Sequence, residues 1–322
     1  MHIKTITYIV LIIIILINPT KSFQYASQGL YQWATRIVPT LFPFMMISSI
    51  MINSGSDIEI GRCLSKLLNK IFRYTHYGIY AIFIGFLCGF PMGAKIVCEL
   101  YASNKLTKHE AESLLGFCNN IGPAYFLGII IPILERYNYN QKAPFIFGMY
   151  GIPAIYGIIL SYLFSQKTPA NTSVINPSNI TITSLEPTIS LHPQNTQSFS
   201  SILKKSCFEN TQSIILLGGY ITFTNAFRVF IDYLPCTANY KSLLSGIIEI
   251  VSGVQLLYQT SFQPKFKIFV IMTLLCFGGI SCLLQTSCFL EKSSISIKHY
   301  LKHKLYITII SALYYLILLY LI

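Results

Sequence analysis

The feature that most constrains this chain is a pattern of helix-breaking residues that occurs twice inside apolar sequence. The two copies are 85–95 (GFLCGFPMGAK) with 117–123 (FCNNIGP), and 246–253 (GIIEIVSG) with 277–282 (FGGISC). The spacing from Gly93 to Phe117 equals that from Gly253 to Phe277, 24 residues in each case. In hydrocarbon, such residues persist mainly where they line a protein-enclosed or water-filled site. Two matching interrupted segments therefore predict a transport site between the two halves of a membrane chain.

The composition indicates a polytopic membrane protein. The 322 residues are 53% hydrophobic and 11% charged, whereas a soluble domain carries about 25% charged residues. The net charge of +12 comes from Lys and Arg residues that lie mostly between apolar segments. The positive-inside rule accounts for this placement, so no nucleic-acid partner is expected. The nine cysteines form no CxxC pair and no metal-ligand spacing, so neither a metal nor another cofactor is predicted.

Apolar runs of about 17–25 residues can cross a bilayer as helices. The predicted fold is an all-α polytopic membrane protein with about seven crossing helices and two re-entrant hairpins. The crossings are expected near 3–19, 37–54, 112–134, 144–164, 211–233, 268–289 and 305–322. No A-x-A-like site follows the first run, so we interpret it as an uncleaved span. The interrupted segments 77–101 and 242–258 are the expected hairpins, with two kinked crossings as the alternative.

The two hairpins predict an inverted repeat. With the N-terminus inside, fourteen of the 23 Lys and Arg residues face the inner side and seven the outer side, and two lie in membrane segments. This bias favours that orientation, and the hairpins then enter from opposite faces. The expected divisions are an N-terminal span (1–24), a first gate-type repeat (25–143), a linking span (144–165), a flexible polar linker (166–198), a second gate-type repeat (199–290) and a basic segment with a C-terminal span (291–322).

Residues 57–73 have the pattern of an amphipathic helix on the membrane surface. Arg62, Lys66, Lys70 and Arg73 share one helical face, and the opposite face is apolar. We expect this helix to lie on the anionic inner leaflet of the lipid bilayer. A solvated basic loop is the alternative.

Lys95 and Glu249 are the charged residues that their apolar surroundings explain least. An ammonium costs about 2.5–3.5 kcal/mol at the centre of a membrane helix, so Lys95 is expected to bind an anionic solute or to pair with Glu99, four residues on. Glu249 has no basic residue within four positions. It is expected to meet Lys95 across the repeat, to carry a proton or cation that drives transport, or to make a structural hydrogen bond.

Uncharged polar residues and glycines complete the candidate binding site. Asn119 and Asn120 offer donors and acceptors for a polar solute, with helix–helix hydrogen bonding as the alternative. Four glycines are expected to unwind helices and expose N–H groups to an anion, with close helix packing as the alternative. They are Gly93, Gly122, Gly253 and Gly278. Weaker polar candidates in the second half are Ser252, Gln255, Ser281 and Gln285.

The sequence gives little support for catalysis. It contains no GxSxG, HExxH or P-loop motif and no cluster of histidines in the predicted spans. We therefore expect no enzymatic activity and name no catalytic residue. Arg228 and Asp232, four residues apart near the end of a crossing, are predicted to form a local pair.

Several motifs resemble one known family, the sporulation integral membrane protein YlbJ family, over residues 25–290. They are 39–44 (PTLFPF), 85–95, 106–107 (LT) with 110–111 (EA), 117–123, 246–249 (GIIE) and 277–279 (FGG). The resemblance implies a nucleoside-recognition or gate domain, similar to regions of concentrative nucleoside transporters. It also implies a role in late spore formation and movement of dipicolinic acid across the outer forespore membrane. The chain departs from the family at 250–252, which weakens any role carried over to Ser252.

The leading hypothesis is a transporter or permease for a small anionic solute, with dipicolinic acid as the expected substrate. Its expected site contains Lys95, Asn119, Asn120 and Glu249. The alternatives are a transporter of nucleosides or other small solutes and a non-transporting membrane scaffold for spore assembly. The expected location is the bacterial cell membrane, specifically the outer forespore membrane. A second copy of the chain and other sporulation membrane proteins are candidate partners.

Overall fold

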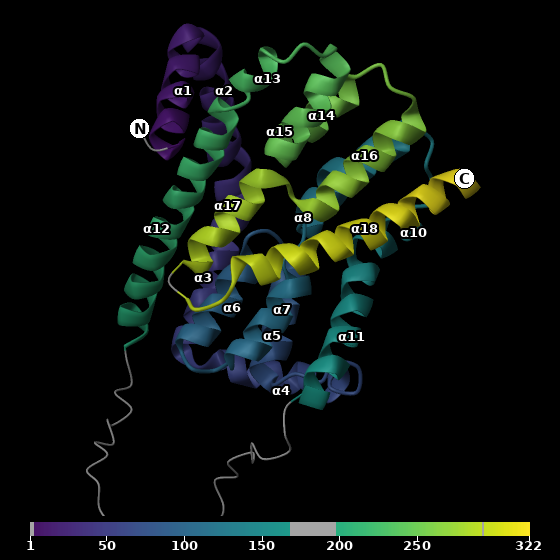
Figure 1. The fold of residues 1–322 in the computed structure, drawn as a ribbon. Helices are drawn as coiled ribbons and strands as arrows, with labels where there is room; N and C mark the ends of the chain where they lie inside the picture. Colours follow the sequence, from purple (N-terminus) through teal and green to yellow (C-terminus); the bar gives the residue numbers. More distant parts are fainter. Residues whose placement is uncertain (1–2, 168–197, 292) are drawn as a thin grey trace, which may run out of the picture.

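The computed structural model describes residues 3–167, 198–291 and 293–322, and these residues form helices and no strand (Figure 1). The predicted all-α fold is therefore confirmed for this part of the chain. Six helical stretches within it are long and apolar enough to cross a membrane. They are Pro19–Ser54, Lys108–Arg136, Ala143–Leu163, Phe199–Asp232, Pro264–Leu290 and Ile297–Leu321. Most of the predicted linker, residues 168–197, lies outside the described residues.

The N-terminal region differs from the predicted pair of crossings. Helix α1 (Ile3–Ile17) has 15 residues, a length of roughly 22 Å at about 1.5 Å per residue, whereas the hydrocarbon core is about 30 Å thick. The predicted crossing 3–19 is therefore not among the six. The next crossing is longer than predicted, because α2 (Pro19–Gln32), the π-helical turn η1 (Trp33–Ile37) and α3 (Val38–Ser54) form one continuous helix.

A helix is present where the amphipathic surface helix is predicted, but it is shorter than the sequence suggested. Helix α4 (Ser56–Leu68) begins after Gly55 and ends before Lys70 and Arg73. Arg62 and Lys66 are exposed on this helix. Asp57 is buried, and its Oδ2 forms an ion pair with Lys105 Nζ at 2.6 Å.

The first half then contains a short helix pair and a broken helix. The pair is α5 (His76–Cys88) and α6 (Met92–Ala102). Thr75 starts α5, because its hydroxyl accepts a hydrogen bond from the Gly78 N–H at 3.1 Å. Helix α7 (Lys108–Cys118) follows, and its path is interrupted at 119–122 before it resumes as α8 (Pro123–Tyr125), η2 (Phe126–Ile130) and α9 (Ile131–Arg136). The linking span consists of α10 (Ala143–Ile146), η3 (Phe147–Gly151) and α11 (Ile152–Lys167).

The second half repeats this order. Helix α12 (Phe199–Ala226) packs along α2 and α3, and the short α13 (Val229–Asp232) follows it. The second pair is α14 (Ala238–Ile248) and α15 (Ile250–Gln259). The second broken helix is α16 (Pro264–Phe277) and α17 (Gly279–Leu290), which Gly278 separates at a φ of +89°. Helix α18 (Ile297–Leu321) ends the chain.

The two helix pairs lie at opposite ends of the molecule, α5 and α6 in the lower half of Figure 1 and α14 and α15 in the upper half. Two buried apolar clusters match this division. One is formed mainly by α5, α6 and α7, and the other packs the segment after the first break against α15 and α16. Each connection lies against a helix break, because Gly89 contacts Gly122 and the Ile247 carbonyl lies close to Gly279.

Candidate functional site

The connection of the first helix pair rests on the first helix break. Phe90 N–H donates to the Asn120 carbonyl at 2.5 Å. A Cβ atom added to Gly89 would lie 2.2 Å from the Gly122 nitrogen, so the two backbones approach too closely for any side chain at either point. The break predicted at 119–123 and the predicted pair 77–101 therefore meet inside the protein.

Lys95 is paired within its own helix. Its side chain is 3% exposed and forms an ion pair with Glu99, four residues on along α6. Of the partners considered for Lys95, the structure therefore shows Glu99. No described ion pair joins Lys95 to Glu249.

Asn119 and Asn120 are held by residues of the second half and the C-terminal helix. The Asn119 amide donates to Thr286 Oγ1 at 3.0 Å and to the Tyr300 hydroxyl at 3.2 Å. Lys304 Nζ donates to the Asn119 carbonyl at 2.9 Å and to Asn120 Oδ1 at 3.1 Å. Lys304 is 1% exposed, although it is one of the fourteen Lys and Arg residues that the charge count assigns to the inner side. Its burial follows from its position in α18, one turn after Tyr300.

Glu249 caps the start of α15. Its two carboxylate oxygens accept from the backbone N–H groups of Val251 at 3.0 Å and Ser252 at 2.7 Å. These N–H groups lie in the first turn, which has no intrahelical acceptor for them, and a negative charge there is favoured by the helix dipole. The structure thus gives this 3% exposed carboxylate a structural hydrogen-bonding role.

Three of the four predicted glycines lie at close backbone contacts. A Cβ atom at Gly93 would be 2.4 Å from the Cys118 carbonyl oxygen, and one at Gly122 would be 2.6 Å from that of Cys88. At Gly253 it would be 2.0 Å from the Gly246 Cα, where α14 and α15 cross. Gly278 takes a left-handed conformation and lies against the Phe90 ring. Close packing therefore accounts for Gly93, Gly122 and Gly253, whereas Gly278 lies where the helix is interrupted between α16 and α17.

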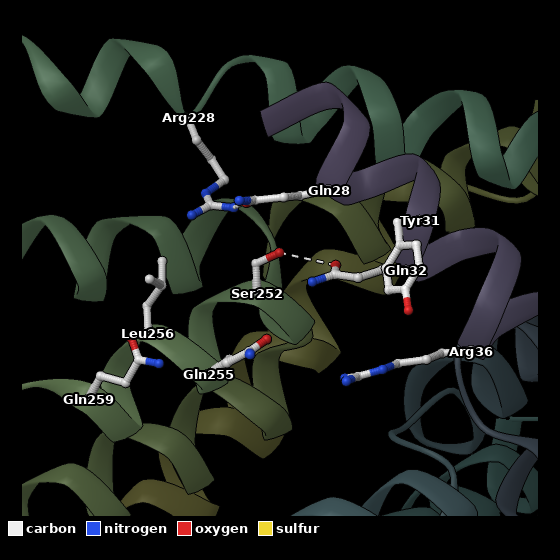
Figure 2. Close-up of a pocket in the computed structure, with 9 residues that line it drawn as sticks. All are labelled: Gln28, Tyr31, Gln32, Arg36, Arg228, Ser252, Gln255, Leu256 and Gln259. Atoms are coloured by element: carbon white, nitrogen blue, oxygen red, sulfur yellow. Dashed lines mark hydrogen bonds between the residues drawn. The ribbon is translucent and has the colours of Figure 1, made fainter. Parts of the chain in front are cut away.

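A polar cavity of about 300 Å³ lies between α2, the start of α13 and α15 (Figure 2). The lining residues come from helices far apart in the sequence, and the sequence predictions included two of them, Ser252 and Gln255. The complete lining is Gln28, Tyr31, Gln32, Arg36, Arg228, Ser252, Gln255, Leu256 and Gln259. In Figure 2, Arg228 and Arg36 lie at opposite ends of the cavity, with Gln32 and Ser252 between them.

Arg228 is the buried cation of this cavity. It is 4% exposed, lies over the Tyr25 ring at 4.6 Å and donates to Asn225 Oδ1 at 3.2 Å. Its Nε is buried and has no hydrogen-bond partner among the described residues. The predicted local pair with Asp232 is wrong, because Asp232 instead binds Lys21 at 3.4 Å and accepts from the Tyr25 hydroxyl at 3.1 Å.

Ser252 connects the cavity to the predicted site residues. Its backbone N–H binds Glu249, and its hydroxyl donates to Gln32 Oε1 at 3.0 Å. Lys95, Asn119 and Asn120 do not line the cavity. The other weak candidates, Ser281 and Gln285, bind each other at 3.0 Å within α17.

The sequence does contain a signal for this cavity. Gln24, Gln28, Gln32 and Arg36 recur at every fourth position of one helix, and Ser252, Gln255 and Gln259 fall on one face of another. The lining residues include two guanidinium groups and no carboxylate. Guanidinium groups bind carboxylate and phosphate oxygens in a bidentate manner, and glutamine amides add donors and acceptors. The arrangement is suited to a small anion.

Fold and cavity together define a helical, multi-pass membrane protein with a cationic polar cavity between its helices. The chain is similar to the sporulation integral membrane protein YlbJ of Bacillus subtilis (strain 168). The two sequences are 23% identical in an alignment 306 residues long, and the match covers 87% of this chain and 73% of that protein. The predicted resemblance to the YlbJ family is thereby confirmed. No family model matches the chain, and no solved structure matches it.

Proposed function

We propose that this protein is a transporter or permease for a small anionic solute in a membrane of sporulating cells. The observation that carries the proposal is the cavity between α2, α13 and α15, where Arg36 and Arg228 face a polar space without a carboxylate in its lining. Two guanidinium groups beside one cavity, neither of which forms a described ion pair, are costly in a chain of apolar helices unless they have a partner. The similarity to a sporulation integral membrane protein supports the cellular setting.

The cavity favours an anion over a nucleoside. A volume of about 300 Å³ is at the lower end of the range for small-molecule sites. An anion with two carboxylates on a small ring would meet one guanidinium at each end, and the glutamines would bind its remaining polar atoms. Dipicolinic acid, which the family resemblance suggests, has this chemistry. Nucleosides carry no charge that would offset the two arginines.

The architecture suggests how access to the cavity would alternate. In this proposal the pairs α5–α6 and α14–α15 enter the membrane from opposite faces as re-entrant hairpins, and the two halves form an inverted repeat. The cavity then lies beside the second hairpin, so that movement of one half against the other would open it to each side in turn. The proposed location is the outer forespore membrane, on the basis of the resemblance.

Uptake of radiolabelled dipicolinate into proteoliposomes tests the proposal. The informative variant is Arg36→Gln, because Arg36 is exposed to the cavity and its side chain makes no hydrogen bond or ion pair with a described residue. Apparent affinity should fall at least about tenfold, since a hydrogen bond to a charged group contributes about 1.5–3 kcal/mol and about 1.4 kcal/mol is a factor of ten.

Arg62→Gln is the matched control, because Arg62 is exposed on α4, away from the cavity. It should leave uptake unchanged. Nucleosides are assayed in parallel. If the folded wild-type protein takes up neither dipicolinate nor nucleosides, the transport proposal fails and the scaffold alternative gains support.

A further inference from the structure

At the first helix break, carbonyl oxygens lack the N–H donors that a continuous helix would supply. Helix α7 ends at Cys118, and residues 119–122 are not helical before Pro123 begins the next turn. The last carbonyl groups of a helix have no intrahelical donor, and the C-terminal end of a helix carries a partial negative charge. A break inside a membrane protein therefore creates a local site that favours a cation.

Lys304 supplies a cation at this break from a distant part of the chain. Its ammonium lies 2.9 Å from the Asn119 carbonyl oxygen, 3.1 Å from Asn120 Oδ1 and 4.4 Å from the centre of the Phe90 ring. Two neutral oxygens and an aromatic face are ligands that also hold unattached monovalent cations in proteins. Lys304 is 1% exposed, and no described ion pair joins it to a carboxylate.

Two other lysines of the described residues are buried, Lys95 and Lys267. Lys95 pairs with Glu99. Lys267 donates to the Tyr137 hydroxyl at 3.1 Å and to the Tyr258 carbonyl at 3.2 Å, and neither acceptor lies in a break within a membrane helix. Lys304 is thus a buried charge whose hydrogen-bond acceptors are neutral groups of the interrupted segment, which is the arrangement expected of a bound ion and not of a salt bridge.

Three parts of the fold meet at this ammonium group. Phe90 belongs to the connection of the first helix pair and donates its N–H to Asn120. Asn119 donates to Thr286 of α17, and Lys304 itself comes from α18. A cation at this point holds the first helix pair, the first broken helix and the second half in one arrangement.

We propose that Lys304 is a tethered cation that occupies a monovalent-cation site formed by the first helix break. The site is permanently filled, so the break closes against the α5–α6 connection without a soluble ion. Removal of the lysine side chain to Cβ leaves an empty site of the size and polarity of an alkylammonium ion. A small primary ammonium ion therefore binds there and restores the cross-link. This inference goes beyond the proposed substrate and does not depend on it.

Thermal unfolding of the purified protein in detergent tests the inference without a transport assay. Lys304→Ala should lower the Tm, and propylammonium chloride should restore most of the loss, whereas propanol and tetramethylammonium chloride should not. The matched control is Lys302→Ala, two residues away on the same helix and exposed. It should change neither the Tm nor the response to propylammonium.

A second variant separates the charge from the space that the side chain fills. Lys304→Met keeps the length of the apolar stem but has no ammonium group, so it should also be less stable than the wild type and should not respond to propylammonium. A Met variant as stable as the wild type would overturn the proposal, even if the Ala variant cannot be purified. A destabilised Ala variant that propylammonium fails to rescue would overturn it as well.

Discussion

At the residue scale, substitution of Glu249 shows whether its carboxylate has a structural role or carries a proton. Both of its oxygens accept backbone N–H groups at the start of α15. Glu249→Gln removes the charge and one of the two acceptors, so we expect a loss of about 1 kcal/mol in the free energy of unfolding, the usual contribution of a helix cap. Thermal unfolding in detergent measures the loss.

The same variant tests the competing role of Glu249. If the carboxylate carries the proton that drives transport, Glu249→Gln will keep the wild-type stability and abolish uptake. If it is a cap, stability falls and uptake per folded molecule is largely retained. Lys265→Gln is a suitable control, because Lys265 is exposed at the start of α16, beyond the other end of α15, and its substitution should affect neither quantity.

At the element scale, the second helix pair depends on two glycines that allow its helices to touch. A Cβ atom at Gly253 would lie 2.0 Å from the Gly246 Cα, a distance that requires the two backbones to move apart. Gly253→Ala should therefore lower the free energy of unfolding by about 1–3 kcal/mol or more, the range for overpacking.

The matched control is Gly219 of α12, where the same methyl group would meet nothing within 4 Å. Gly219→Ala should instead leave stability unchanged or raise it by up to about 1 kcal/mol. If both variants behave alike, the close crossing does not determine the stability of the pair.

The elements that sequence could predict are those whose signal is local. The break at 119–123, the glycine break at Gly278 and the two short pairs follow from helix-breaking residues inside apolar runs, and the structure has a break or a connection at each. Part of the cavity is lined by polar residues of α2. In the sequence these residues resemble a solvated connection between helices, so the crossing was predicted to begin near residue 37, whereas the helix extends over Pro19–Ser54. Lys304 was misplaced for a related reason. Its acceptors lie some 185 residues earlier in the sequence, and no local pattern indicates them.

At the scale of the whole molecule, the proposed inverted repeat requires the two helix pairs to open toward opposite sides of the membrane. Ser103, after α6, and Ser261, after α15, are exposed at the bases of the two pairs and are suited to single cysteine substitutions. The exposed native Cys63 and Cys207 and the half-buried Cys236 and Cys288 are first replaced by serine. A membrane-impermeant maleimide applied to intact cells should label Ser261→Cys, which the charge bias places outside. The maleimide should label Ser103→Cys only after the membrane is permeabilised.

Restoring Cys63 in α4 provides the internal reference, because its label should appear together with that of Ser103→Cys. Labelling of both substituted positions from one side would contradict the inverted repeat and favour two kinked crossings, because an interrupted segment that crosses the membrane once reverses the side of every loop after it.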